Sequence, residues 1–243
     1  MTRTATGRTV EAVWRIESAK LIAALARTVR DVGLAEELAQ DALVAALEQW
    51  PESGVPDNPG AWLTAVARRR GIDVLRRRER LARKQEELGR VLEARQEATA
   101  DELEEALDDE IGDERLALAF TTCHPVLSRD ARVALTLRLL GGLATPEIAR
   151  AFLVPEATVA QRIVRAKRTL AEARVPFEVP AGDELSARLA SVLEVVYLVF
   201  NEGYAATAGD ALLRPDLCAE ALRLGRILVA LAPEEPEVHG LLA

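Results

Sequence analysis

The sequence predicts an all-α protein. Its 243 residues are 49% apolar and 29% charged, a composition typical of globular chains, and this length suits two or three compact domains. Aromatic residues are scarce, with three Trp, two Tyr and four Phe, whereas Ala, Leu, Arg and Glu dominate. Because the dominant residues favour helices, while strands prefer β-branched and aromatic side chains, we expect helices throughout.

Cysteine usage and hydropathy narrow the class of protein. Cys123 and Cys218 stand far apart, in no spacing that suits a metal site, so we expect no disulfide scaffold, metal or cofactor. No apolar run approaches the roughly 18 residues of a membrane span, and residues 1–9 are polar. We therefore expect a protein of the reducing cytoplasm with no membrane partner.

The charge is unevenly distributed along the chain. The total is −8, but residues 1–80 carry +2, residues 81–112 carry −7, residues 113–175 carry +4 and residues 176–243 carry −7. Two mildly basic blocks thus alternate with two acidic ones, which indicates separate modules with different partners. The net acidity disfavours non-specific DNA binding by the chain as a whole.

The first block reads as three helices. Amphipathic patterns predict helices over residues 11–30 and 34–50, and a third follows over residues 61–83. Residues 51–60 contain three prolines and two glycines and are expected to form a loop. The second helix carries five polar residues: Glu36, Glu37, Gln40, Asp41 and Glu48. We expect them to form a solvated face, and binding to a basic partner is the alternative.

The third helix combines an aromatic residue with a basic face. Trp62 shares one face with Arg69, Asp73, Arg76 and Arg80. An aromatic ring beside guanidinium groups can stack on unpaired bases and neutralise phosphates. The alternative is a tryptophan packed in a core beside a solvated basic face.

Residues 84–112 are helix-compatible but dense in Glu and Asp, with few large apolar residues. We expect a solvated acidic linker here, because such a composition buries little apolar surface. A packed helix is the alternative.

Residues 145–170 carry the pattern of a helix-turn-helix. Residues 145–152 predict a short helix, with Thr145 as the N-cap and Pro146 in the first helical position. Pro155 then breaks the pattern, and residues 156–170 predict a second helix.

The second of these helices has two distinct faces. A narrow apolar stripe contains Val159, Ile163, Ala166 and Leu170. The opposite side carries polar residues of the kind that contact base edges and phosphates: Thr158, Gln161, Arg162, Arg165 and Arg168. A surface helix with solvated arginines is the alternative, but the preceding turn favours DNA recognition.

Three sequence strings carry a family resemblance. The strings AEELAQDAL (residues 35–43) and AWLTAVARRRGIDVLRR (residues 61–77) resemble region 2 of bacterial extracytoplasmic-function (ECF) sigma factors of the sigma-70 family. The string EIARAFLVPEATVAQRIVRAK (residues 147–167) resembles their region 4. The resemblance implies region 2 over residues 8–83, an acidic linker over residues 84–112 and region 4 over residues 113–175.

The resemblance implies a subunit of RNA polymerase that directs promoter recognition and transcription initiation. Region 2 would dock on the clamp helices of the β′ subunit through Glu36, Glu37, Gln40 and Asp41. It would hold the −10 element of promoter DNA through Trp62, Arg68, Arg69, Asp73, Arg76 and Arg77. Region 4 would approach the β flap and read the −35 element through Thr158, Gln161, Arg162, Arg165 and Arg168.

The base preference of region 4 does not follow from the resemblance. Ala157 stands where the family commonly has glycine, and Ala160-Gln161 stands where Lys-Ser is common.

Residues 183–243 form a third helical block beyond the minimal sigma architecture. The string RLASVLEVVYLVFNEGY (residues 188–204) is similar to the start of the extension in the ECF subgroup that has a long helical, tetratricopeptide-like C-terminal domain. The pattern stops partway, so we expect a truncated extension. The −7 charge of residues 176–243 and the short tether to a +4 block predict an action in cis, either covering part of region 4 or bracing regions 2 and 4. An independent domain on a flexible linker is the alternative, and an unknown regulatory protein is a further expected partner.

Two other functional classes are disfavoured. An enzyme would need a polar catalytic constellation, yet the chain has only His124 and His239, and Cys123 next to His124 is expected to be a buried packing residue. A helix-turn-helix regulator that acts without becoming a polymerase subunit explains residues 145–170 but not the Trp/Arg helix.

Overall fold

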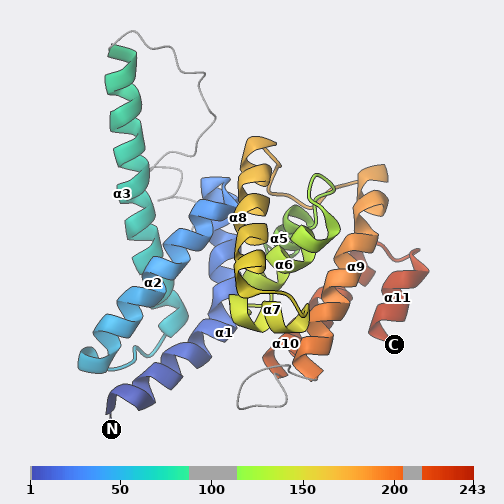
Figure 1. Ribbon diagram of the computed structural model, residues 1–243, viewed down its shortest axis with the longest axis horizontal. Coiled ribbons are helices and arrows are strands. Elements are labelled where there is room, and N and C mark those ends of the chain that lie inside the picture. Colours follow the sequence, from blue (N-terminus) through green and yellow to red (C-terminus); the bar gives the residue numbers. More distant parts are fainter. Residues whose placement is uncertain (1, 88–113, 205–214) are drawn as a thin grey trace. The chain divides into compact units, whose positions relative to one another are not determined.

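The computed structural model describes residues 2–87, 114–204 and 215–243 as helices and short connections (Figure 1). The chain divides into two compact units, Met1–Gly112 and Asp113–Ala243. No helix in the described ranges is long and apolar enough to cross a membrane, and no group of three or more His, Cys, Asp or Glu side chains in them could hold a metal ion. The predicted all-α class is confirmed.

The first unit contains α1 (Thr2–Val29), α2 (Val32–Ser53) and α3 (Pro59–Glu87). The connection between α1 and α2 is very short: Arg30 adopts a left-handed conformation with φ of 52°, and the Asp31 carboxylate then accepts the N–H groups of Gly33 (2.8 Å) and Leu34 (3.0 Å). Such a side-chain cap satisfies N–H groups that have no partner within the helix. The tight turn makes α1 and α2 pack along each other, and α3 packs against both.

The core of this unit is aliphatic with one tryptophan. Leucines of all three helices and Trp50 are almost fully buried: Leu21, Leu25, Leu34, Leu38, Trp50, Leu63 and Leu75. From Arg76 to Arg83, most of the α3 side chains that the structure describes are exposed. A long stretch of basic helix surface is therefore accessible.

Several predicted boundaries are displaced. Helix α1 begins at Thr2 and not at residue 11, and α3 runs to Glu87 and not to residue 83. Residues 51–53, predicted as loop, form the last turn of α2, because a proline there removes one N–H bond without ending the helix. The predicted acidic linker lies mostly outside the described residues.

The second unit contains α5 (Glu114–Thr122), α6 (Arg129–Leu139), α7 (Thr145–Ala151) and α8 (Glu156–Glu172), followed by α9 (Asp183–Tyr204), α10 (Pro215–Leu231) and α11 (Pro236–Leu242). Helix α8 packs against α6 and α7, and α9 packs against α5 and α6. Helices α10 and α11 complete the stack on α9. The predicted boundary between residues 175 and 183 thus lies inside one compact unit.

Polar contacts reinforce the packing of α9. The buried Arg188 donates a hydrogen bond to the carbonyl oxygen of Phe120 on α5 (2.6 Å). On α6, Arg129 pairs with Glu194, with its Nε 2.8 Å from Oε1, and Arg132 donates to the Ser191 hydroxyl (2.5 Å). These contacts join two segments that the sequence suggested as separate modules.

The turn between α7 and α8 has a specific backbone geometry. Leu153 adopts a left-handed conformation with φ of 53°, and the N–H groups of Leu153 and Val154 bond to the carbonyls of Arg150 (3.1 Å) and Ala149 (3.0 Å). This is the Schellman arrangement that ends helices. It turns the chain sharply and lets α8 begin three residues later.

The start of α7 corrects one prediction. Ala144, and not Thr145, is the N-cap, and Thr145 is already helical. The Glu147 carboxylate accepts the Ala144 N–H (2.6 Å), which supplies part of the capping that a Thr145 hydroxyl was expected to give.

Candidate nucleic-acid interface

The predicted acidic face of α2 is smaller than expected. Glu36 is only 4% exposed, and the Gln40 amide donates to its carboxylate (2.7 Å). Glu36 therefore does not belong to the solvated face on which the sequence placed it. It lies within the helical unit, where a hydrogen bond offsets part of the cost of burying its carboxylate.

The exposed face of α2 mixes acidic and apolar side chains. Glu37 and Asp41 are exposed on it, together with Val44 (47% exposed), Leu47 (48% exposed) and Glu48. Their spacing of three or four residues places them along one side of the helix. Sequence reasoning missed Val44 and Leu47, although their spacing from Asp41 was a usable signal.

Asp41 also contacts the neighbouring helix. Its carboxylate lies 3.1 Å from an Nη of Arg70 on α3, and both side chains are substantially exposed. This ion pair links the acidic face of α2 to the beginning of the basic surface of α3.

Trp62 is part of the packing between α2 and α3. Its ring meets the buried Trp50 ring edge-on, with centroids 5.3 Å apart and an interplanar angle of 66°. Trp62 is half-buried, so the structure supports the packing alternative while leaving part of the ring at the surface.

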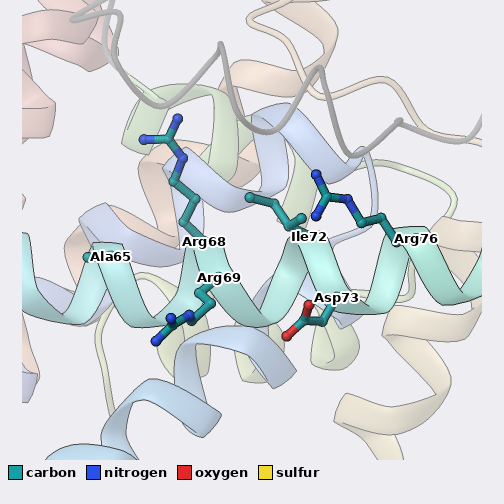
Figure 2. Close-up of a pocket in the computed structure, with 6 residues that line it drawn as sticks. All are labelled: Ala65, Arg68, Arg69, Ile72, Asp73 and Arg76. Carbon is teal, nitrogen blue, oxygen red and sulfur yellow. The ribbon is translucent and has the colours of Figure 1, made fainter.

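The basic surface of α3 contains a shallow hollow of about 330 Å³ (Figure 2). Figure 2 shows Arg68, Ile72 and Arg76 projecting to one side of the helix, with Arg69 and Asp73 on the other. Ala65 completes the lining. Four of the six residues predicted for the −10 element line this hollow, whereas Trp62 and the exposed Arg77 are not among the lining residues. Ile72, which was not predicted as a site residue, adds an apolar side chain between guanidinium groups.

The two faces of α8 follow the sequence pattern closely. Val159, Ile163, Ala166 and Leu170 are buried. Gln161, Arg165 and Arg168 are exposed, and Thr158 and Arg162 are partly buried at the flanks. The helix therefore presents a polar surface opposite the stripe that fixes it to α6 and α7.

Two of the arginines of α8 are engaged within the protein. Arg162 lies 2.9 Å from the carboxylate of Asp130 in the first turn of α6, which holds its side chain toward α6. Arg168 donates to Glu172 one turn further along (2.7 Å), and this hydrogen bond raises the pKa of the Arg168 guanidinium above its usual value. Gln161 lies closer to the start of the helix than either arginine, in the part where recognition helices contact bases, and the exposed Arg165 follows one turn later.

Comparison with protein families matches three segments of the chain. Residues 16–81 match the family described as Sigma-70 region 2, and residues 117–170 match Sigma-70, region 4. Residues 188–243 match a family of unknown function, DUF6596. The first match runs from the middle of α1 into α3, the second runs from α5 into α8, and the third runs from α9 to α11.

A relative from Rhizobium meliloti (strain 1021), "Uncharacterized protein R00370", is 46% identical over 221 residues. The alignment covers 90% of this chain and 52% of the relative. The chain thus spans about half the length of that protein. No solved structure matches the chain.

Proposed function

The chain belongs to the sigma-70 family of RNA polymerase sigma factors, and from that premise we propose that it binds core polymerase and directs promoter recognition and transcription initiation. The observation that carries the proposal is the presence of region 2 and region 4 in this order, each with an exposed polar helix surface. We further assign the protein to the ECF type and to the cytoplasm. It acts by binding and supplies no catalytic group.

We assign core-polymerase binding to the exposed face of α2. Two apolar side chains, Val44 and Leu47, lie among Glu37, Asp41 and Glu48. Apolar contacts surrounded by polar ones are typical of protein interfaces, and carboxylates favour a basic partner surface. The clamp helices of the β′ subunit are the proposed partner. The buried Glu36 contributes indirectly, by accepting the hydrogen bond that orients the Gln40 side chain.

We assign the −10 element to the hollow on α3. Arg68, Arg69 and Arg76 offer positive charge to phosphates, and Ile72 offers an apolar surface to a base. This combination suits an unpaired strand, whose bases are free to contact side chains.

We assign the −35 element to the exposed face of α8. Gln161 and Arg165 are suited to contact base edges in the major groove, because both are exposed and lie one turn apart on the polar face of the helix. Thr158, Arg162 and Arg168 lie at the flanks or further along, where phosphates are the closer target.

The C-terminal extension is proposed to act in cis as a brace of region 4. Its helix α9 contacts α5 and α6 through Arg188, Glu194 and Ser191. The exposed residues of α8 remain accessible in this arrangement. The extension thus packs on α5 and α6, and α6 in turn packs against α8, so that the exposed face of α8 stays uncovered.

The test is transcription in vitro with core polymerase and a promoter library. The full chain is expected to bind promoter DNA specifically only together with core polymerase. A helix-turn-helix regulator would bind alone, an alternative that the region 2 match does not favour. Specific binding by the chain without polymerase, and no transcription with it, would reject the proposal.

Two variants separate the assigned surfaces. Glu37→Lys should weaken assembly with core polymerase, because charge reversal removes attraction and adds repulsion. Arg165→Ala should leave assembly intact and lower discrimination at the −35 element by about 1–3 kcal/mol. Glu234→Lys, in the connection between α10 and α11, is the charge-reversal control and should behave as the unaltered chain.

A further inference from the structure

Val164 is apolar, yet it lies on the exposed side of α8 that is proposed above to face DNA. It is 61% exposed, three residues after Gln161 and four before Arg168. Residues with these spacings are neighbours on a helix surface. Its position is about 140° around the axis from the buried Val159, at 100° per residue, so it contributes nothing to the stripe that packs on α6 and α7.

The surroundings of Val164 leave its methyl groups accessible. Ala160, one turn earlier, is exposed and short, and Ala157 precedes it on the same side of the helix. Arg165, the next residue, and Gln161 provide polar groups on the adjoining part of the surface. An aliphatic group is thus framed by hydrogen-bonding side chains in the middle of the exposed face.

The major groove presents one apolar group among its hydrogen-bonding atoms, the C5 methyl of thymine. An aliphatic side chain on a groove-facing helix surface therefore recognises thymine by contact between methyl groups. We propose that Val164 is a specificity-determining residue that contacts the C5 methyl of a thymine in the −35 element. This inference rests on the proposed function, since it requires α8 to occupy the major groove.

The test uses a chemical change confined to that methyl group. A randomised duplex library is first selected with the holoenzyme to obtain a promoter duplex. Each thymine of its −35 element is then replaced singly by deoxyuridine, which lacks the methyl group but keeps the base-pairing atoms. Binding of the holoenzyme to each duplex is measured for the unaltered chain and for Val164→Ala.

One position is expected to respond. The unaltered chain should lose about four-fold in affinity when that thymine becomes deoxyuridine, the equivalent of ~0.8 kcal/mol for one buried methyl-sized group. Val164→Ala should bind the thymine duplex about four-fold more weakly than the unaltered chain does. This variant should bind the thymine and deoxyuridine duplexes with equal affinity. Such coupling between protein and base changes identifies the pair in contact. Val126→Ala, the same change at an exposed valine between α5 and α6, should keep the full response to deoxyuridine.

Other results overturn the inference. Equal binding of the thymine and deoxyuridine duplexes at every position would show that no methyl group is read. A selected −35 element without thymine, or a Val164→Ala variant as sensitive to deoxyuridine as the unaltered chain, would remove the role of Val164 and leave the sigma-factor assignment standing. If the holoenzyme selects no sequence, the proposed function fails and the inference fails with it. Circular dichroism of Val164→Ala checks that the exposed substitution leaves the helices intact.

Discussion

The guanidinium of Arg188 lies 5.8 Å from the centroid of the Phe120 ring and donates a hydrogen bond to the Phe120 carbonyl oxygen. Glu184, one turn earlier on α9, accepts a second hydrogen bond from it (2.8 Å). One almost fully buried cation thereby connects α9 of the C-terminal extension to α5 of region 4. A buried charge of this kind is stable only while its partners remain in place.

Arg188→Ala is expected to destabilise the second unit by about 2–4 kcal/mol, because it removes a charged hydrogen bond and leaves a void beside Phe120. All three tryptophans, Trp14, Trp50 and Trp62, belong to the first unit. Tryptophan fluorescence therefore monitors unfolding of the first unit, whereas far-ultraviolet circular dichroism monitors both. Arg188→Ala should lower the unfolding transition of the second unit, which only circular dichroism detects, and should leave the fluorescence transition of the first unit unchanged. Arg226→Ala, at an exposed position of α10, should shift neither.

Leu153→Gly is expected to stabilise the second unit by roughly 0.5–1 kcal/mol. Leu153 is 93% exposed and holds a positive φ of 53°, so glycine relieves backbone strain and loses little packing. Leu153→Ala keeps the Cβ atom and should give no gain. Urea unfolding followed by circular dichroism measures both variants. Destabilisation by Leu153→Gly would mean that the leucine side chain contributes contacts in the folded state.

The Cys123 thiol is expected to resist alkylation in the folded protein. Burial raises its pKa to about 11, against hydrogen bonds from Thr136 and Thr122 that lower it. At pH 8 only on the order of one thiol in a thousand is then the reactive thiolate. Iodoacetamide labelling followed by mass spectrometry should modify the half-buried Cys218 first and Cys123 only after unfolding. Equal labelling of both thiols in the folded chain would contradict this.

The same thiol gives a pH dependence of stability. The folded state keeps the Cys123 proton up to about pH 11, whereas an unfolded thiol loses it near pH 9. Between these values the unfolded state binds fewer protons, so this group makes the second unit less stable as pH rises. Cys123→Ala should reduce the slope of unfolding free energy against pH in that window.

Trp62→Ala is expected to lower the stability of the first unit by about 1–3 kcal/mol, because it removes the edge-on contact with Trp50. Trp62→Phe preserves an aromatic contact and should restore most of the loss. The fluorescence of Trp14 and Trp50, which remain in both variants, follows unfolding of the first unit. If both variants are as stable as the unaltered chain, Trp62 does not support the core and its role lies at the surface.

The sequence predicted the helices and the two faces of α8 because both follow from residue periodicity. Val159, Ile163, Ala166 and Leu170 are buried as their spacing indicates. Local periodicity cannot show which faces meet. Burial of Glu36, contact of Trp62 with Trp50 and attachment of α9 to α5 all depend on residues distant in sequence or on neighbouring helices. Arg162 shows the same limit, since the partner that turns it toward α6, Asp130, lies 32 residues earlier.

The attachment of α9 to α5 and α6 determines the order in which the protein can be completed during synthesis. The buried residues described for the first unit are all present once α3 has emerged, and domains fold as units from the N-terminus. The second unit begins at α5 but lacks Arg188 and the apolar face of α9 until much later. The surface proposed for polymerase binding therefore matures on the nascent chain before the DNA-reading domain has its full support.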